Sequence, residues 1–169
     1  YFSDQVPPLG AVHIEGLIKG KVGDLKARRL NLAFAERSSL QGSFDLTNVT
    51  NPQNLNLRTN DLTIKTQPED IRWLGDLFAE VNWPEQLAQL GQIVWRGSYQ
   101  GGLDNLRSDF DLQTAVGSVR ADLKLLSLSD PEALQYEGNL KTDSLALGQL
   151  LQSPLLGNLS LDLFLEGKG

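Results

Sequence analysis

The chain has no cysteine, no methionine and only one histidine in 169 residues. Without cysteine it forms no disulfide and no thiolate metal site. The single histidine, His13, cannot build a multi-histidine site, and its position on the polar face of an alternating segment favours a solvated side chain. Without methionine, residue 1 is not a translation start. We therefore expect the chain to be one segment of a longer protein.

Positive charge and long apolar runs are also scarce. The net charge of −6 argues against binding nucleic acid or anionic lipid surfaces through overall electrostatics. Basic residues interleaved with aromatic ones are missing, so no nucleic-acid partner is predicted. No apolar run approaches the roughly 18 residues of a membrane-spanning helix, and the sequence shows no signal peptide.

Patterns that would carry chemistry are missing too. The acidic residues are scattered; Asp109 and Asp111 could share a strand face, but no base, nucleophile or glycine-rich turn accompanies them. Gly16, Gly20 and Gly23 have the wrong order for a phosphate loop and precede no predicted helix. We interpret them as markers of bulges, bends or strand ends. The sequence predicts no enzymatic activity, no cofactor and no metal.

Alternation of apolar and polar residues is what the chain does have. Over residues 159–165 every second residue is leucine, and the residues between are polar or aromatic. A period of two predicts strands with one apolar face, and several such runs joined by short turns predict a mainly β, antiparallel meander. The residues predicted to line the apolar face are Val12, Ile14, Ile18, Leu30, Leu32, Phe34, Leu40, Phe44, Leu46, Ile93, Trp95, Tyr99, Phe110, Leu112, Val119, Leu123, Leu125, Leu140, Leu159, Leu161 and Leu163.

One segment, residues 67–89, has helical spacing instead. Pro68 followed by two acidic residues suits a first helical turn. A second, short helix is predicted to restart at Pro84, with Asn82 as its cap. We expect one principal helix within 68–90 that covers an end or an open face of the sheet. Its apolar stripe is formed by Ile71, Leu74, Leu77, Phe78 and Val81.

The pattern also repeats. Gly91 lies 81 positions after Gly10, and at the same offset Gly97 aligns with Gly16 and Gly101 with Gly20. Later segments align after small shifts. The sequence therefore predicts a first repeat copy over 9–89, a second over 90–155 and the first strand of a third over 156–169, with neighbouring copies completing each unit.

The apolar face allows two interpretations. The sheet could fold on itself around a closed, dry core, or it could form a curved half-pipe whose lumen holds acyl chains. The helical segments are too short to cover the whole face. Composition alone favours the closed core.

Three segments bear a family resemblance: LGAVHIEGLIKGKVGDL (9–25), LGQIVWRGSYQGGLDNLRSDFDL (90–112) and LALGQLLQSPLLGNLSLDLFLEGKG (145–169). Their Leu-Gly turns (147–151), alternating strands that end in Gly-x-Gly, and Gly-x-x-Asn-Leu turn (102–106) resemble the TamB/AsmA superfamily. These are periplasmic relatives of the bridge-like lipid transfer proteins. The resemblance covers essentially the whole chain.

This resemblance implies a strongly curved, taco-like sheet with an apolar concave face. It also implies a periplasmic segment of an inner-membrane-anchored rod that carries phospholipid between the inner and outer membranes. The partners implied are phospholipid acyl chains, neighbouring repeats of the same chain and a BamA-family (TamA-like) outer-membrane barrel. The residues of the apolar face would then be a non-specific groove lining, with none of them catalytic.

A second hypothesis is a scaffold or chaperone for outer-membrane β-barrel proteins, which would offer a sheet edge to nascent strands. A third is an extracellular adhesin-like array, which would need two equally apolar sheets and long binding loops. The predicted turns are short, which disfavours the third hypothesis.

Overall fold

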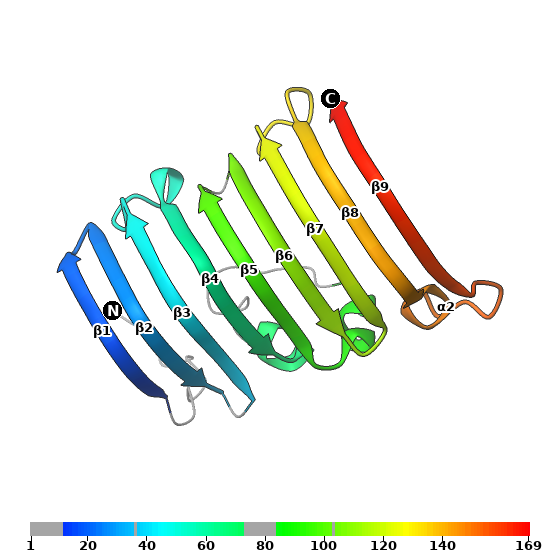
Figure 1. The fold of residues 1–169 in the computed structure, drawn as a ribbon, viewed down its shortest axis with the longest axis horizontal. Coiled ribbons are helices and arrows are strands. Elements are labelled where there is room, and N and C mark those ends of the chain that lie inside the picture. The colour runs from blue at the N-terminus through cyan, green and yellow to red at the C-terminus, as the bar shows by residue number, and fades with distance from the viewer. Residues whose placement is uncertain (1–11, 36, 73–83, 103) are drawn as a thin grey trace.

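The computed structural model describes residues 12–35, 37–72, 84–102 and 104–169. They form one nine-stranded sheet in which every strand is antiparallel to its neighbours in the sequence. The sheet is an open meander, since β1 and β9 do not pair (Figure 1). The strands are β1 (His13–Lys21), β2 (Asp24–Phe34), β3 (Ser38–Thr47), β4 (Asn56–Thr66), β5 (Ile93–Gly101), β6 (Leu106–Thr114), β7 (Gly117–Leu126), β8 (Gln135–Ala146) and β9 (Asn158–Lys168). The prediction of a mainly β, antiparallel meander is confirmed.

Strands and turns follow the sequence pattern closely. The β1–β2 turn lies at Val22 and Gly23, as the glycine indicates. The chain reverses before β3 near Ala35, which has a positive φ of 49°, and Ser38 is the first residue of β3. The extended stretch with Leu57 and Ile64 is a single strand, β4.

Helical segments are short and lie between strands. Residues 68–72 are helical. The other helical segments of the described residues are η1 (Pro52–Asn54), η2 (Glu85–Leu90) and α2 (Leu147–Leu150). The predicted second helix is therefore a 3₁₀ turn. Of the predicted principal helix, Ile71 is helical, whereas Leu74, Leu77, Phe78, Val81 and the predicted cap Asn82 lie outside the described residues.

The helical turn 68–72, η2 and α2 lie at the same end of the strands (Figure 1). Each comes from a connection that follows β4 or β8. The amide of Ala115, in the β6–β7 turn, donates to the carbonyl of Leu90 at 2.8 Å, and the amide of Ala146 donates to the carbonyl of Val116 at 2.7 Å. These bonds tie the connections to the strand ends, so the described helical turns border an end of the sheet.

Three strands contain one extra residue. Arg29 in β2, Asn60 in β4 and Ser144 in β8 each fall where the pairing register shifts. Arg29 and Ser144 have φ values of 50° and 55°, the left-handed region that one residue of a bulge can adopt. Among the glycines predicted to mark irregularities, Gly16 lies at a register shift and Gly23 in a turn, while Gly20 lies within β1.

The core of the described residues is thin. Its buried apolar residues are few, and none of its large side chains is completely buried. A single sheet with no second sheet against it in the described part of the chain explains this, because each side chain is covered only by neighbours on its own face. The buried apolar residues are Ala27, Leu30, Leu62, Ile93, Val94, Val116 and Ala121.

The predicted repeat copies contain β1–β4 in the first, β5–β8 in the second and β9 in the third. A helical turn follows β4, and α2 follows β8. The division of the chain into repeats stays a prediction.

Candidate functional site

The apolar side chains form rows that run across the sheet. One row begins at Ile14 on β1 and ends at Leu161 on β9, and each member lies directly opposite the next across a pair of strands. Eight of its nine positions are apolar; the exception is Thr142 on β8. The complete row is Ile14, Leu32, Leu40, Ile64, Trp95, Leu112, Val119, Thr142 and Leu161.

Three further rows lie on the same face, because they are reached by steps of two along each strand or across the bulges. The second runs Leu30, Gly42, Leu62, Gly97, Phe110, Ala121, Leu140 and Leu163, and the third runs Ile18, Ala27, Phe44, Thr59, Tyr99, Ser108, Leu123, Gly138 and Leu165. The fourth runs Gly20, Leu25, Leu46, Leu57, Gly101, Leu106, Leu125, Tyr136 and Gly167. Charged side chains are absent from all four rows.

The structure therefore brings the predicted face residues together. Phe34, Ile93 and Leu159 lie one step of two beyond the first row, and Val12 immediately precedes β1. Their role as a groove lining stays a prediction.

Several face residues were missed. The sequence list omits Leu25, Leu57, Leu62, Ile64 and Leu106, although their alternation is plain once the bulges are known. The extra residue in β2 and in β4 changes the numbering from odd to even within one strand, so a strict period of two does not join the two halves. This change from odd to even positions was the sequence signal that could have revealed the bulges and the missed residues.

A depression of about 380 Å³ lies in the middle of the apolar face. It spans β4 to β7, and the rings of Trp95 and Phe110 stack beside one another with centroids 6.1 Å apart and an angle of 28° between their planes. Its size falls at the low end for small-molecule sites. The lining consists of Leu57, Leu62, Ile64, Trp95, Tyr99, Leu106, Ser108, Phe110, Leu123 and Leu125.

Its two hydroxyl groups are already satisfied. The Tyr99 hydroxyl donates to the carbonyl of Gly102 at 2.7 Å, and the Ser108 hydroxyl donates to the carbonyl of Ser98 at 2.8 Å. Burial raises the pKa of the Tyr99 phenol. Elsewhere on the face Thr59 and Thr142 donate to the carbonyls of Ser43 and Ser118 in the same way. The face therefore offers a ligand apolar contact and few free polar partners.

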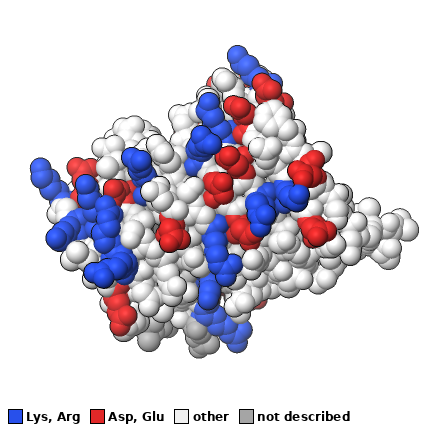
Figure 2. All heavy atoms as spheres, viewed as in Figure 1, with Lys and Arg blue, Asp and Glu red and all other residues white. Residues whose placement is uncertain are grey.

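The opposite face is polar and carries charges of both signs, as Figure 2 shows. Cross-strand ion pairs join Arg120 to Asp111 at 3.2 Å and Lys141 to Asp162 at 2.6 Å. His13 lies on this face too, exposed and 3.1 Å from Glu15. Asp109 and Asp111 share it, as predicted, and Asp109 lies directly opposite Asp122. Such exposed pairs contribute little to stability.

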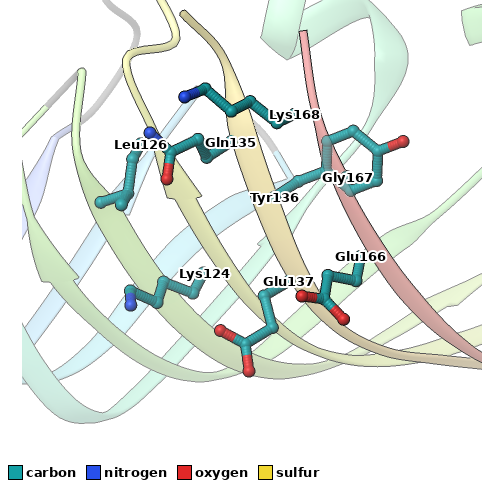
Figure 3. A pocket seen from close by; sticks show the side chains of 8 residues that line it. All are labelled: Lys124, Leu126, Gln135, Tyr136, Glu137, Glu166, Gly167 and Lys168. Carbon is teal, nitrogen blue, oxygen red and sulfur yellow. The ribbon is translucent and has the colours of Figure 1, made fainter.

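A second depression, of about 490 Å³, lies over β7–β9 (Figure 3). Lys124, Glu137 and Glu166 form one cross-strand row of its lining, and Leu126, Gln135 and Lys168 form the next. The Tyr136 ring lies against the backbone of Gly167. The charged groups of this depression stand at an open surface, and its lining holds no histidine that could activate a nucleophile. The apolar face is therefore the stronger candidate site.

The described residues contain no group of three or more histidine, cysteine or acidic side chains that could hold a metal ion. None of the helices in the described ranges is long and apolar enough to cross a membrane. Comparison with family models, with curated proteins and with solved structures finds no match for this chain.

Proposed function

We propose that the chain is a segment of a TamB/AsmA-like periplasmic protein, and that its apolar face carries phospholipid acyl chains between the inner and outer membranes. The observation that supports this most is the first row, whose apolar side chains cross all nine strands with a single hydroxyl among them. In this proposal the sheet is strongly curved, with the apolar face on its concave side.

The energetics suit a sliding ligand. Each CH₂ group removed from water contributes about 0.8 kcal/mol, so an acyl chain gains by lying on the face without any specific contact. At a strand spacing of roughly 4.8 Å, nine strands span roughly 40 Å. A strip of that length with similar side chains throughout has no single deep binding well, so a bound chain can move along it.

The polar groups of the face support the same idea. Thr59, Ser108 and Thr142 donate their hydroxyl protons to backbone carbonyls of the neighbouring strand. They therefore do not compete for a lipid headgroup, which would remain in water beyond the rim. The anchor in the inner membrane, the periplasmic location and the BamA-family partner belong to the proposal through the resemblance.

A second candidate function is a scaffold for outer-membrane β-barrel proteins. It is favoured by a different observation: among the residues that the structure describes, β1 and β9 each pair with a neighbour on one side only. The backbone groups of such edges can accept an additional strand. In this function the sheet edges, and not the apolar face, would bind the client.

The experiment uses Trp95 as a reporter inside the central depression. Trp73 and Trp83 are replaced by phenylalanine, which leaves Trp95 as the one tryptophan of the chain. Phospholipid with brominated acyl chains should quench Trp95 fluorescence, whereas the same lipid without bromine should not. A brominated headgroup analogue should quench it less.

Two charge substitutions then test the path. Leu123→Arg and Leu32→Asp place a charge on the apolar face, and Asn139→Arg and Gln41→Asp place the same charges on the polar face as matched controls. We expect the first pair to remove quenching while cooperative unfolding is kept, because a wall open to water tolerates a charge that a dry core does not. Loss of folding in both face variants, with no quenching in the parent chain, would overturn the lipid function.

A further inference from the structure

Positive charge gathers at the β1–β2 hairpin, although the chain as a whole is acidic. Over residues 13–34 there are five lysines and arginines against two acidic residues, while the net charge of the chain is −6. Figure 2 shows lysine and arginine side chains concentrated on the side where Figure 1 places β1–β3. Net charge alone therefore hides a cationic region.

The strand register makes this region unusual. Lys19 and Lys26 lie directly opposite each other across β1 and β2, a like-charge pair that is destabilising, while Lys21 lies opposite Asp24. The same row continues through Asp45 to Arg58. Asp45 is already engaged by Arg28, whose guanidinium holds the pKa of that carboxyl below its usual range. This one carboxylate is shared among Arg28, Lys26 and Arg58, so it does not offset the whole positive charge of the row.

Apolar side chains are exposed at the same place. Val22, at the tip of the hairpin turn, is 79% exposed, whereas the exposed Ile14 and Ile18 of β1 belong to the apolar face on the other side of the sheet. Leu17, on the polar face between the charged residues, is 43% exposed. The amide of Val49 donates to the carbonyl of Gly23 at 3.0 Å, which holds the turn against the β3–β4 connection. A fixed hairpin therefore presents apolar and cationic groups together.

We propose that the β1–β2 hairpin binds the surface of a bilayer that contains anionic phospholipid. Lys19, Lys21 and Lys26 would face the phosphates, and Val22 would enter the boundary between headgroups and acyl chains. Apolar side chains combined with basic ones are the general requirement for binding at a membrane surface. This docking goes beyond lipid passage along the apolar face and does not require it.

A lysine on an edge strand can also serve only to prevent pairing with other sheets. That explanation covers Lys19 and Lys21 on β1, but not Lys26, which lies on the second strand, nor the exposure of Val22. Membrane binding accounts for all of them.

The test measures flotation of the whole chain with vesicles of phosphatidylcholine, with or without about 30% phosphatidylglycerol, at low and at high salt. We expect binding to the anionic vesicles only, weakened by salt. The triple substitution Lys19→Gln, Lys21→Gln and Lys26→Gln should lower this binding roughly 100-fold, since each lysine near an anionic surface contributes about a factor of five. Val22→Ser, which removes the apolar side chain without changing the charge, should lower it while the salt dependence is kept.

The matched control is Lys124→Gln, Lys141→Gln and Lys168→Gln, which removes the same charge from the polar face of β7–β9. An equal loss in this control, or no binding by the parent chain, would refute the proposal. If the hairpin triple variant instead changes the molecular mass in solution without vesicles, β1 is a self-association edge and the proposal is wrong. Quenching of Trp95 by brominated lipid is measured separately, so failure of hairpin docking and failure of lipid passage can be told apart.

Discussion

Gly97 on β5 lies directly opposite Phe110 on β6, and a Cβ atom built on Gly97 would be 2.7 Å from the Cα atom of Phe110. The same Cβ would be 2.1 Å from the carbonyl oxygen of Asp109. Because both contacts are with backbone, no rotation of a side chain can relieve them. A small residue beside a large one recurs on this face, as at Gly138 opposite Leu123.

We therefore predict that Gly97→Ala lowers the free energy of unfolding by about 1–3 kcal/mol, the usual cost of forcing atoms into a packed site. Gly157→Ala is the control, because a Cβ there has no atom within 4 Å. Urea denaturation followed by circular dichroism gives both values. Equal stability of the two variants would show that the strands can separate freely at Gly97.

Asp104 connects two turns through hydrogen bonds. Its carboxylate accepts hydrogen bonds from the amide and the hydroxyl of Ser129, at 2.8 and 2.7 Å, and so joins the β5–β6 turn to the β7–β8 connection. These bonds lower the pKa of the Asp104 carboxyl. A lowered pKa in the folded state means that the stabilisation is present above the unfolded pKa of about 3.9, and is lost as the pH falls through the folded pKa.

We accordingly expect Asp104→Asn to be less stable than the parent at neutral pH, with the difference shrinking below about pH 4. Urea midpoints measured between neutral and acidic pH check this. Glu132→Gln, at an exposed position of the same connection, controls for the change in net charge. A difference that stays constant over the whole pH range would mean that the carboxylate charge is not what matters.

Ser38 connects the start of β3 to the helical turn at residues 68–72. Its hydroxyl donates to the Asp70 carboxylate at 2.5 Å and lies 2.8 Å from the Thr66 hydroxyl. Since Ser38 has one proton, and gives it to Asp70, it accepts from Thr66. This chain of bonds is buried at the Ser38 end.

Ser38→Ala removes these hydrogen bonds and should lower the free energy of unfolding by about 1–2 kcal/mol. The helical turn at residues 68–72 should then open more easily than the sheet unfolds. The local measurement is hydrogen exchange at the Ile71 amide, which donates to the carbonyl of Gln67. Ser39→Ala changes the neighbouring serine, which points to the other face, and should leave that exchange slow. Unchanged protection in Ser38→Ala would show that the turn is held by other contacts.

How far the sequence predicts this structure is decided by the bulges. Strands with unbroken alternation, such as β9 with Leu159, Leu161 and Leu163, could be assigned in face and extent from the period of two alone. In β4 the apolar positions change from odd at Leu57 to even at Leu62, and the sequence could not distinguish one bulged strand from two strands.

The placement of the face also depends on the register between distant strands. Trp95 and Ile64 lie opposite one another although a helical segment separates them in the chain. Nothing local specifies that pair; it follows from matching all the apolar residues of two strands at once. Charge shows the same limit, because the opposition of Lys19 and Lys26 becomes visible only when β1 and β2 are aligned.

The bulge at Arg29 gives the last prediction. Between Ala27 and Leu30 the strand holds two residues where its partner β3 holds only Ser43, so Arg29 is the extra one. Without it, Ala27, Arg28 and Leu30 would alternate regularly and every side chain would keep its face. Arg29 also has a φ of 50°, which is unfavourable for a residue with a Cβ atom.

Deleting Arg29 should therefore leave a folded protein whose stability changes by no more than about 2 kcal/mol. The relief of backbone strain is offset by loss of the hydrogen bond from the Arg29 amide to the Ser43 hydroxyl. Deleting Asn31, two positions away, should be far worse. Leu30 and Leu32 would then be adjacent, so one of them would have to turn to the polar face. Losing the bulge would not prevent this, because Arg29 would then point to the apolar face and Leu30 to the polar face. Thermal unfolding of the two deletions decides the matter, and equal loss of cooperativity in both would contradict the register described for β2.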